Sequence, residues 1–469
     1  MDFLTPITTA AQMQACDRFT IEMEPISSVA LMERASRAVY NTLKQEWQPR
    51  STIMVICGPG NNGGDGLCIA RMALVDGFNV KVVLVHGDCT PSEDQQFQLK
   101  LLQQYKPGVV YNFNEGDTIP FNGIDYIVDG LFGTGLRSKA EGVFAAIINQ
   151  VNNSGISVFA IDLPSGLSDT KNFGAGSYIQ SVLTIGIECA KPSYFSPNHN
   201  INFKLIRAGI KTDQIVPSMY FLSPQEPWIS SLEKWLPKNP IFGHKGTMGS
   251  VLLIGGAKGM SGAIALAAKS CIENGAGYTR VLTAAESEPW LAVIPKAMCT
   301  TEGLHSTAFT SLFNSSIDVI AIGPGLGTGI ESKELLIKVL STGKKIVIDA
   351  DALNIVAQDS KVLQQIPKGS LLTPHPGEFL RLFGFGADDP DFIHKGCALA
   401  SDLGIHILAK NKYSTFFSAD GEVIVGDLGN PSLAQGGSGD RLTGAIAAWW
   451  AKTDNVTTAV IAGQYYMGC

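Results

Sequence analysis

The sequence predicts an α/β protein of two domains, each built around a parallel sheet. Short apolar runs alternate with helical segments along most of the 469 residues, which is the pattern of repeated strand–helix–strand units. Hydrophobic residues make up 45% of the chain and charged residues 16%, enough apolar material for large cores. Glycine-rich loops directly follow several apolar runs, at the strand ends where open α/β sheets bind ligands.

The first domain is expected over residues 1–215. Residues 8–47 carry apolar side chains at helical spacing, and a strand is predicted over 51–57. The motif GPGNNGGDG follows, and then a helix over 67–75 and further strands over 80–85, 126–128, 158–161 and 182–187, the last of the sheet. VDGLFGTGL and IDLPSG follow two of these strands, so the three loops should converge on one crevice.

Residues 216–238 are expected to form a linker, because four prolines fall there or at its edge without any periodicity. The second domain is then expected over 239–469. Its predicted strands cover 251–254, 319–322, 345–348 and 371–372, and its predicted helices cover 261–274 and 442–450.

The loop GPGNNGGDG, residues 58–66, is a candidate phosphate-binding site. Its glycines, Gly58, Gly60, Gly63 and Gly64, would let the backbone approach a pyrophosphate closely, whereas an ordinary flexible loop is the alternative. Further side chains with oxygen atoms lie in this loop or at the ends of neighbouring strands. Asn62, Asp129 and Ser165 together contain one carboxylate, and this low charge suits a monovalent cation better than Mg²⁺ or Zn²⁺.

Two aspartates at strand ends each allow two interpretations. Asp129, followed by glycine and then Arg137, could face a cation and a phosphate, or it could cap the next helix. Asp162 could be a general acid or base, or it could form a structural turn.

In the second domain GGSGD, ending at Asp440, is the strongest candidate. Its backbone N–H groups could hold a negative charge while Asp440 takes a proton from a substrate hydroxyl; a glycine turn with an N-cap aspartate is the alternative. Three loops should reach the same edge: GPGLG, TPHPGE with His375 between two prolines, and GMSGA. Asp349 and Asp351 could bind Mg²⁺ through water or only cap a helix.

Composition argues against several classes of protein. The net charge is −7 and Lys and Arg form no run, so a nucleic-acid partner is not expected. No window approaches about 18 apolar residues, so no membrane partner is expected. Nine scattered cysteines and an N-terminus without a signal-peptide pattern indicate a reducing compartment, the cytoplasm.

The ordered motifs resemble those of two enzyme families. GPGNNGGDG, VDGLFGTGL and IDLPSG resemble the NAD(P)H-hydrate epimerases. HKGTMGSVLLIGG, GMSGA, GPGLG, DADALN, TPHPGE and GGSGD resemble the NAD(P)H-hydrate dehydratases, and the two fused resemble the bifunctional repair enzymes. The resemblance implies a Rossmann-like three-layer α/β/α domain followed by a ribokinase-like α/β/α domain.

The resemblance also implies a function. An epimerase with bound K⁺ would interconvert the R and S forms of NADH hydrate and NADPH hydrate. A dehydratase would use ADP with Mg²⁺ to dehydrate the S form, giving AMP and phosphate. A homo-oligomer is expected, and the family usually continues past Cys469 with a final helix.

Site residues follow from the resemblance by position, with Asp162 and Asp440 as the catalytic groups. The epimerase substrate would contact Asn61, Asn62, Gly63, Gly64, Asp65, Gly133, Thr134, Gly135, Leu136, Arg137, Ser138, Lys139 and Asp162, and K⁺ would contact Asn62, Asp129 and Ser165. The hydrate in the dehydratase would contact Ala263, Gly325, His375 and Asp440. The adenosine nucleotide would contact Lys410, Asn411, Lys412, Tyr413, Ser414 and Gly439.

Asn411 stands where the family often has glycine, and Ser438 where it commonly has threonine. Two other functions remain open. One is a ribokinase-like kinase acting on a vitamin precursor or sugar alcohol, because GGSGD alone does not exclude it. The other is a non-catalytic binding module, because the first fold also occurs in scaffolds such as an RNA-decapping one.

Overall fold

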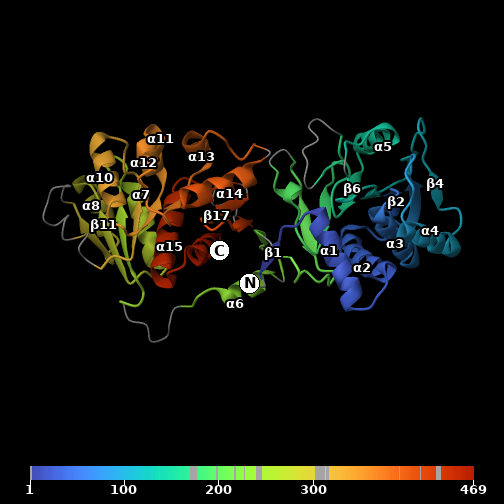
Figure 1. The fold of residues 1–469 in the computed structure, drawn as a ribbon, viewed down its shortest axis with the longest axis horizontal. Coiled ribbons are helices and arrows are strands. Elements are labelled where there is room, and N and C mark those ends of the chain that lie inside the picture. The colour runs from blue at the N-terminus through green and yellow to red at the C-terminus, as the bar shows by residue number, and fades with distance from the viewer. Residues whose placement is uncertain are drawn as a thin grey trace. The chain divides into compact units, whose positions relative to one another are not determined.

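The computed structural model describes the chain in two compact units, residues 6–217 and residues 1–5 with 218–469 (Figure 1). The described residues are all except 1–2, 137, 169–176, 197–198, 216–217, 227, 239–245, 302–311, 313–315, 390, 412, 429–434 and 469. Within them, no helix is long and apolar enough to cross a membrane. Each unit is an α/β fold, as the sequence predicts.

The first unit contains a seven-stranded sheet in which every strand pair is parallel. Its order is β4-β3-β2-β5-β6-β7-β8, with bounds β2 Thr52–Cys57, β3 Asn79–Leu84, β4 Val110–Asn112, β5 Tyr126–Gly130, β6 Ser157–Ile161, β7 Leu183–Ile187 and β8 Phe203–Ile206. The expected last strand, β7, is confirmed as a strand but not as the last one. The half-buried β8 follows it at the sheet edge, where its apolar run is too short to stand out in the sequence.

Helices cover both faces of this sheet, so the unit has three layers. They are α1 Ala10–Met23, α2 Ser28–Glu46, α3 Asn61–Val75, α4 Glu93–Tyr105 and α5 Gly142–Asn153, with the 3₁₀ turn η1 Pro192–Phe195. Ile53 and Val55 of β2 share a core with α2 and α3, while Met54 and Ile56 share the opposite core with α5. Figure 1 shows α5 apart from the other helices. The helix expected over 8–47 is two helices, because Ser27 caps a new one.

The second unit contains an eleven-stranded sheet of order β1-β9-β18-β17-β16-β15-β14-β13-β10-β11-β12. The strands are β1 Leu4–Pro6, β9 Met219–Leu222, β10 Ser250–Ile254, β11 Tyr278–Leu282, β12 Ala297–Thr300, β13 Val319–Ile322, β14 Lys345–Ile348, β15 Leu371–Leu372, β16 His406–Ala409, β17 Ser414–Phe417 and β18 Val423–Gly426. The stretch from β12 to β16 is parallel, and β17 is antiparallel to both neighbours.

The helices of this unit are also divided between the sheet faces. They are α6 Trp228–Trp235, α7 Ser261–Glu273, α8 Glu288–Ala292, α10 Ile330–Leu340, α11 Ala350–Gln358, α12 Ser360–Leu363, α13 Pro376–Phe383, α14 Phe392–Leu403, α15 Ser438–Thr453 and α16 Val456–Gly468, with η2 Ala285–Ser287. Phe416 of β17 shares a core with α7, α15 and α16. Its neighbour Phe417 points to the other face, where it lies 5.5 Å from Phe392 of α14 between ring centroids.

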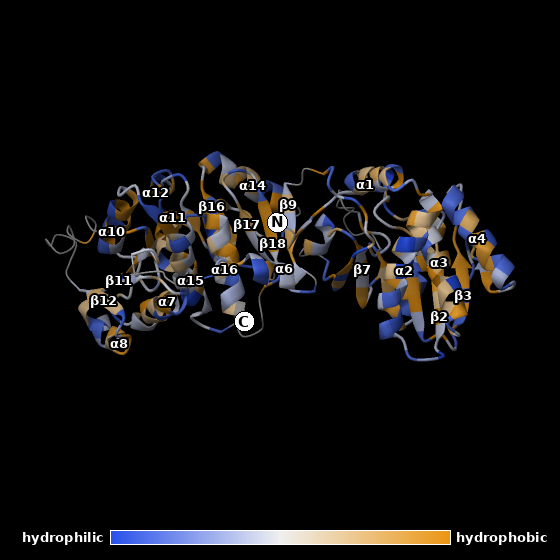
Figure 2. Cartoon of the chain, turned by 90° about the horizontal axis from the view of Figure 1, so that it is seen from below, coloured by the Kyte–Doolittle hydropathy of each residue, from blue (hydrophilic) through white to orange (hydrophobic). Residues whose placement is uncertain are grey.

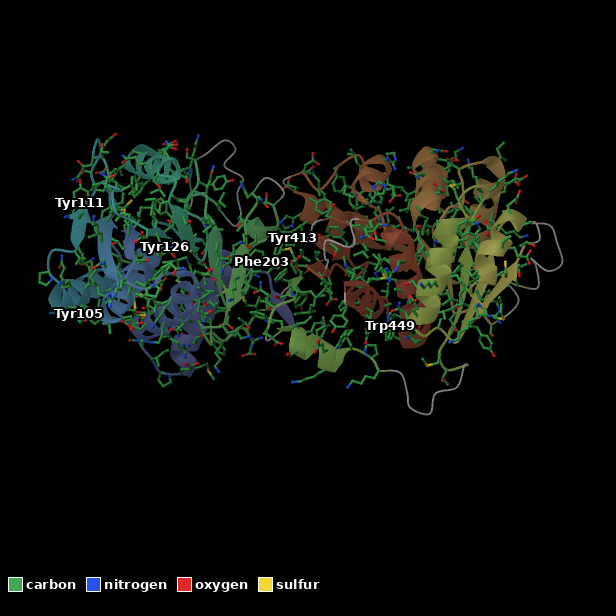
Figure 3. All side chains as sticks on the ribbon, turned by 180° about the vertical axis from the view of Figure 1, so that it is seen from behind. Tyr105, Tyr111, Tyr126, Phe203, Tyr413 and Trp449 are labelled. Carbon is green, nitrogen blue, oxygen red and sulfur yellow. The ribbon has the colours of Figure 1, made fainter. Side chains whose placement is uncertain are left out.

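The sheets are the apolar centres of both units. Hydrophobic residues concentrate in strands such as β2 and β3, while the helices also carry polar residues (Figure 2). Tyr126 of β5 packs edge-on against Phe159 of β6, whereas Tyr105 and Tyr111 are exposed (Figure 3).

The linker expected over 216–238 is not a separate linker, because residues from 218 onward belong to the compact second unit. β9 pairs with β18, and Trp228 and Leu232 of α6 are buried. Phe3, near the N-terminus, packs on Trp235 with ring centroids 4.6 Å apart. The prolines here separate short elements, as Pro224 does between β9 and α6, and this spacing hides the periodicity.

Candidate functional site

Asn62, Asp129 and Ser165 lie together in the first unit, as the strand order predicts. The Oγ atom of Ser165 lies 2.6 Å from Asp129 Oδ1 and 3.0 Å from the carbonyl oxygen of Phe132. Asn62 Nδ2 donates to the same carbonyl at 2.8 Å. Asn62 and Ser165 therefore share the Phe132 carbonyl oxygen just beyond β5, and the Ser165 hydroxyl connects this group to Asp129.

Asp129 is a buried carboxylate held by neutral groups. The Ser165 N–H donates to Oδ2 at 2.8 Å and the Leu131 N–H donates to Oδ1 at 3.2 Å. Asp129 is only 1% exposed, and burial raises its pKa to about 6 despite these hydrogen bonds. These contacts rule out the alternative that Asp129 caps the following helix, since its acceptors are used within the strand-end cluster.

The glycines of GPGNNGGDG serve mainly to fit the chain against itself. Asn61 begins α3, so most of the motif is helical rather than an open loop. A Cβ atom at Gly58 would lie 1.8 Å from the Leu131 carbonyl oxygen, and one at Gly63 would lie 2.0 Å from that of Gly58. Gly60 alone has open space around it. Gly58 and Gly63 are therefore needed for chain packing, and the expected approach to a pyrophosphate stays a prediction.

A cleft of about 600 Å³ adjoins this cluster. It contains eight of the expected epimerase substrate residues: Asn61, Asn62, Asp65, Gly133, Thr134, Gly135, Leu136 and Asp162. Gly63 and Gly64 are buried behind it, and Ser138 and Lys139 are exposed outside its lining. Arg137 lies outside the described residues. Helices α1 and α2 supply an apolar wall, including Met13, Leu31 and Met32, that sequence reasoning missed.

Asp162 occupies this cleft in a strained backbone conformation, with φ at +61°. Its Oδ1 accepts from the Ile187 N–H at 3.0 Å and from Lys191 Nζ, and its carbonyl oxygen accepts from the Tyr194 hydroxyl. Asp162 is thus held by contacts from several elements and is more than a turn former.

Lys191 is a site residue that sequence reasoning missed. Its side chain is 1% exposed, and Nζ also donates to the carbonyls of Ile187 at 3.0 Å and Cys189 at 2.9 Å. The sequence did contain a signal for it, since Lys191 lies inside the largely apolar segment IECAKPSYF. A lysine is almost never buried without a partner, so a buried lysine here would need an acidic residue nearby.

Two further carboxylates line the cleft. Burial raises the pKa of Asp65 to about 7, although the Ser36 hydroxyl donates to it at 2.7 Å. Burial and the nearby Asp162 charge raise the pKa of Asp17 of α1 to about 6. The resemblance includes Asp65 but not Asp17.

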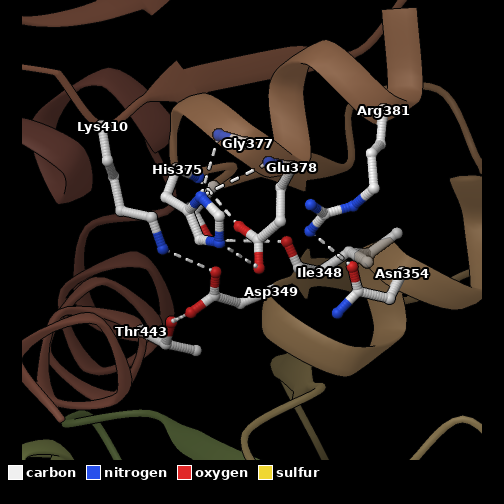
Figure 4. Close-up of polar contacts among 10 residues, drawn as sticks. Ile348, Asp349, Asn354, His375, Gly377, Glu378, Arg381, Lys410 and Thr443 are labelled. Atoms are coloured by element: carbon white, nitrogen blue, oxygen red, sulfur yellow. Dashed lines mark hydrogen bonds and ion pairs between the residues drawn. The ribbon is translucent and has the colours of Figure 1, made fainter. Parts of the chain in front are cut away.

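The second unit contains a buried ion pair at the end of β14 (Figure 4). Asp349, 1% exposed, accepts from Lys410 Nζ at 2.8 Å and from the Thr443 hydroxyl at 2.6 Å. Its side chain makes no cap bond to α11, and the Asp351 carboxylate accepts from the Gly327 N–H at 2.9 Å. Asp349 thus occupies the N-cap position of α11, as one of the two interpretations predicts, but the hydrogen bonds of both carboxylates go to other segments.

Asp440 lies close to this ion pair. α15 begins at Ser438 after Gly437, whose φ is +88°, so Asp440 is the third helical residue and the N-cap alternative is wrong. Burial and the Asp349 charge raise the pKa of Asp440 to about 6, against the effect of Lys410. A Cβ atom at Gly439 would lie 3.4 Å from Lys410 Nζ, which brings two expected nucleotide residues together.

The glycine loops of this unit meet at the same sheet edge. A Cβ atom at Gly325 would lie 2.7 Å from the Met260 carbonyl oxygen and 3.3 Å from the Cβ of Ala263, so GPGLG contacts GMSGA. A Cβ atom at Gly437 would lie 2.4 Å from the side chain of Leu266 in α7. The glycines here make room for neighbouring elements.

His375 is an exposed N-cap of α13 rather than a core residue. Its Nδ1 accepts from the Gly377 N–H at 3.0 Å, and the Glu378 carboxylate accepts from the His375 backbone N–H at 2.8 Å (Figure 4). Partial burial and the Lys410 charge lower its pKa.

The remaining expected nucleotide residues are spread along β17 and the turn before it. Asn411 and Tyr413 are half-buried, Ser414 accepts from Gln464, and Lys412 lies outside the described residues. Among the described residues, no group of three or more His, Cys, Asp or Glu side chains could hold a metal ion.

Comparison with known proteins identifies both halves. Residues 28–193 match the family model described as YjeF-related protein N-terminus, and residues 251–469 match the one described as NAD(P)H-hydrate dehydratase. A bifunctional NAD(P)H-hydrate repair enzyme from Moorella thermoacetica is 32% identical, over 98% of this chain and 91% of that one.

Two solved structures match the second half. A ribokinase-like superfamily protein from Enterococcus faecalis is 30% identical over 54% of this chain and 86% of its own, with a TM-score of 0.47. An ADP/ATP-dependent NAD(P)H-hydrate dehydratase from Bacillus subtilis, co-crystallised with ATP/Mg²⁺, is 29% identical over 50% and 83%, with a TM-score of 0.43.

Proposed function

The chain belongs to the family of bifunctional NAD(P)H-hydrate repair enzymes, and we propose that each of its two units carries one of the two activities. The protein interconverts the R and S forms of NAD(P)H hydrate and dehydrates the S form at the expense of ADP, giving NAD(P)H, AMP and phosphate. The positions of the two family matches support assigning epimerisation to the first unit and dehydration to the second.

Potassium is the cation proposed for the first unit, held by Asp129, Ser165 and Asn62. The residues fit a monovalent cation because a buried carboxylate with neutral hydrogen-bond donors lies beside a carbonyl and a hydroxyl oxygen. When bound, the cation would compensate the charge of Asp129. The chain's own residues then fix the Phe132 loop, whose following residues line the cleft.

Epimerisation is proposed to occur in the cleft beside Asp162. The reacting carbon of the hydrate bears a hydroxyl and the ring nitrogen, so it can invert by reversible loss of one heteroatom with proton transfer alone. Asp162 is the proposed proton-transfer group. Lys191 and the Ile187 N–H hold one of its oxygens, which fixes the carboxylate at the floor of the cleft.

Dehydration is proposed to begin with phosphorylation of the hydrate hydroxyl. Asp440 takes the hydroxyl proton, the oxygen attacks the β-phosphorus of ADP, and AMP leaves. Phosphate then leaves with the C–O electron pair, and loss of the adjacent carbon-bound proton restores the ring double bond. Backbone N–H groups at the start of α15 and the Lys410 ammonium, near Gly439, face the developing charge. Mg²⁺ is proposed to accompany ADP.

The observation that carries this proposal is the position of Asp440 at the start of α15, beside the Lys410–Asp349 pair. The test is recovery of absorbance at 340 nm from mixed R and S NADH hydrate with ADP, Mg²⁺ and K⁺. Full recovery is expected because epimerisation feeds the S form. Recovery that stops at the S fraction would contradict the epimerase, and a stable phosphorylated product would indicate a kinase.

The cellular location and the oligomeric state of the protein are also proposals. A cytoplasmic location is supported by eight described cysteines that are all unpaired. The expected homo-oligomer stays a prediction, for which sedimentation of the purified chain is the direct measurement.

A further inference from the structure

We propose that Asp17 is the general acid of the epimerase site, and that Lys191 is a positioning residue that holds the carboxylate of Asp162, the general base. This inference rests on the proposed epimerase function of the first unit and divides its proton transfers between two carboxylates. Asp17 reaches the cleft from α1 and Asp162 from the end of β6, so the two groups approach a bound hydrate from different elements.

The contacts of Asp162 hold its carboxylate in one orientation. Lys191 Nζ is buried and has three acceptors, the Asp162 carboxylate and the Ile187 and Cys189 carbonyls. An ammonium group in this setting needs the negative charge of Asp162, because a buried cation without a partner is strongly disfavoured. Among the described residues only Oδ1 of Asp162 is engaged, so Oδ2 is available to accept a proton.

The surroundings of Asp17 favour the protonated form. Within the described part of the chain its carboxyl group has no hydrogen-bond partner, and it lines the cleft. The charged groups that share the cleft with it are Arg18 of α1, Asp65 of α3, Asp94 of α4, Asp162 and Lys191. Burial and Asp162 raise the Asp17 pKa to about 6, while Lys191 and Arg18 lower it. With this pKa, about half of Asp17 carries a proton at pH 6 and about a tenth does at pH 7.

Inversion in this cleft proceeds by loss and re-addition of water. The C–O bond of the hydrate breaks with its electron pair moving to oxygen, Asp17 gives that oxygen its proton, and water leaves. The ring nitrogen lone pair forms a C=N⁺ bond, and nearby carboxylates stabilise the cation. A water molecule then adds to the opposite face, the C=N electrons return to nitrogen, and Asp162 accepts the proton of the added water. Proton exchange with solvent returns both carboxyl groups to their starting states.

Asp17 could not be found from motifs. The first family match begins at residue 28, and Asp17 precedes it on a helix that the sequence presents only as an amphipathic segment. The topology brings α1 to the cleft, where Met13 and Arg18 also line it.

The test compares Asp17→Asn with Glu22→Gln, an exposed carboxyl-to-amide change on the same helix that lies outside the cleft lining. R-NADH hydrate is incubated with K⁺ and without ADP, and the S form is measured by chromatography. Asp17→Asn is expected to lower the rate by about 100-fold or more, the usual contribution of a general acid, whereas Glu22→Gln leaves it unchanged. Hydrogen exchange in residues 6–217 that matches the wild type would show that Asp17→Asn leaves the first unit folded.

Two readouts separate catalysis from structure. The wild-type rate should fall as pH rises from 5 to 8, and this fall should be absent from the residual rate of Asp17→Asn. In water enriched in oxygen-18, each inversion should place one labelled oxygen in the S product. A wild-type rate with Asp17→Asn, or an unlabelled product, would overturn the inference while leaving the epimerase function intact. A wild-type chain that does not epimerise would contradict the proposed function itself, and the inference with it.

Discussion

Two buried aspartates, Asp129 of the first unit and Asp349 of the second, occupy equivalent positions but have opposite partners. Each lies at the carboxyl end of a central parallel strand and is 1% exposed. Asp349 accepts from Lys410, a cation that the chain itself supplies. Asp129 has a serine hydroxyl and two backbone N–H groups, and none of its described hydrogen-bond donors carries a positive charge.

These two sets of partners indicate which ion, if any, each site needs to bind from solution. A buried carboxylate is stable only with a compensating charge or by becoming protonated. Asp349 has that compensation, so its site can be complete before any ligand binds. Asp129 lacks it among the described residues, and a bound monovalent cation is the group that would supply it. The same strand-end aspartate thus supports a structural ion pair in one unit and a proposed ion site in the other.

The first prediction, with the largest change in rate, tests whether the two sites work independently. Asp440→Ala should lower dehydration of the S form by 100-fold or more, because general bases contribute on the order of 10²–10⁴-fold, and it should leave epimerisation unchanged. Asp162→Asn should do the reverse. Each variant is the control for the other, measured with R and S hydrates separately. Loss of both activities in either variant would contradict a two-site enzyme.

The second prediction removes the cation of the pair in the second unit. Lys410→Met leaves Asp349 buried without its partner, which should destabilise this unit by about 3–5 kcal/mol. Lys345→Met, on the strand that Asp349 follows, breaks an exposed pair with Asp454 and should destabilise the unit far less, because solvent screens surface ion pairs. Hydrogen exchange with mass spectrometry reports each unit separately. Equal effects of the two variants would show that the Asp349 pair is not a stabilising contact.

The third prediction concerns the first unit. Potassium should stabilise it against unfolding by about 2.7 kcal/mol at a concentration of 100 times Kd, with no effect on the second unit. Asp129→Asn should abolish this response because the charge that attracts the cation is gone. Hydrogen exchange in K⁺ and in tetramethylammonium at equal ionic strength measures it. A potassium response that survives Asp129→Asn would place the cation elsewhere.

The sequence predicts the framework of these sites well, because strand ends in parallel sheets share an edge. The expectation that Asn62, Asp129 and Ser165 meet is confirmed by their contacts around Phe132. The convergence of GPGLG with GMSGA is confirmed through Gly325 and Ala263. Such predictions succeed because strand order and loop position depend on local patterns of apolar residues and glycine.

What the sequence could not predict depends on contacts between distant segments. Lys191 is 29 residues from Asp162 in the chain, and nothing local shows that its ammonium group is buried. Lys410 is 61 residues from Asp349. The segment 216–238 looked like a linker because β9 is only four residues long and its partner, β18, lies far along the chain. These features need the tertiary structure.

The last prediction, with the smallest change in rate, compares the pH dependence of the two activities. Asp440 must be ionised to accept a proton, and its pKa is raised to about 6. The kcat/KM of dehydration should therefore fall about tenfold per pH unit below 6, whereas epimerisation, which needs protonated Asp17, should fall as pH rises through about 6. ADP also titrates in this pH range, but its titration affects the wild type and the Asp440→Asn variant alike. A fall in kcat/KM at low pH that the wild type shows and the variant lacks therefore belongs to Asp440. Parallel profiles for the two activities would mean that the acid and base roles assigned to these carboxylates are wrong.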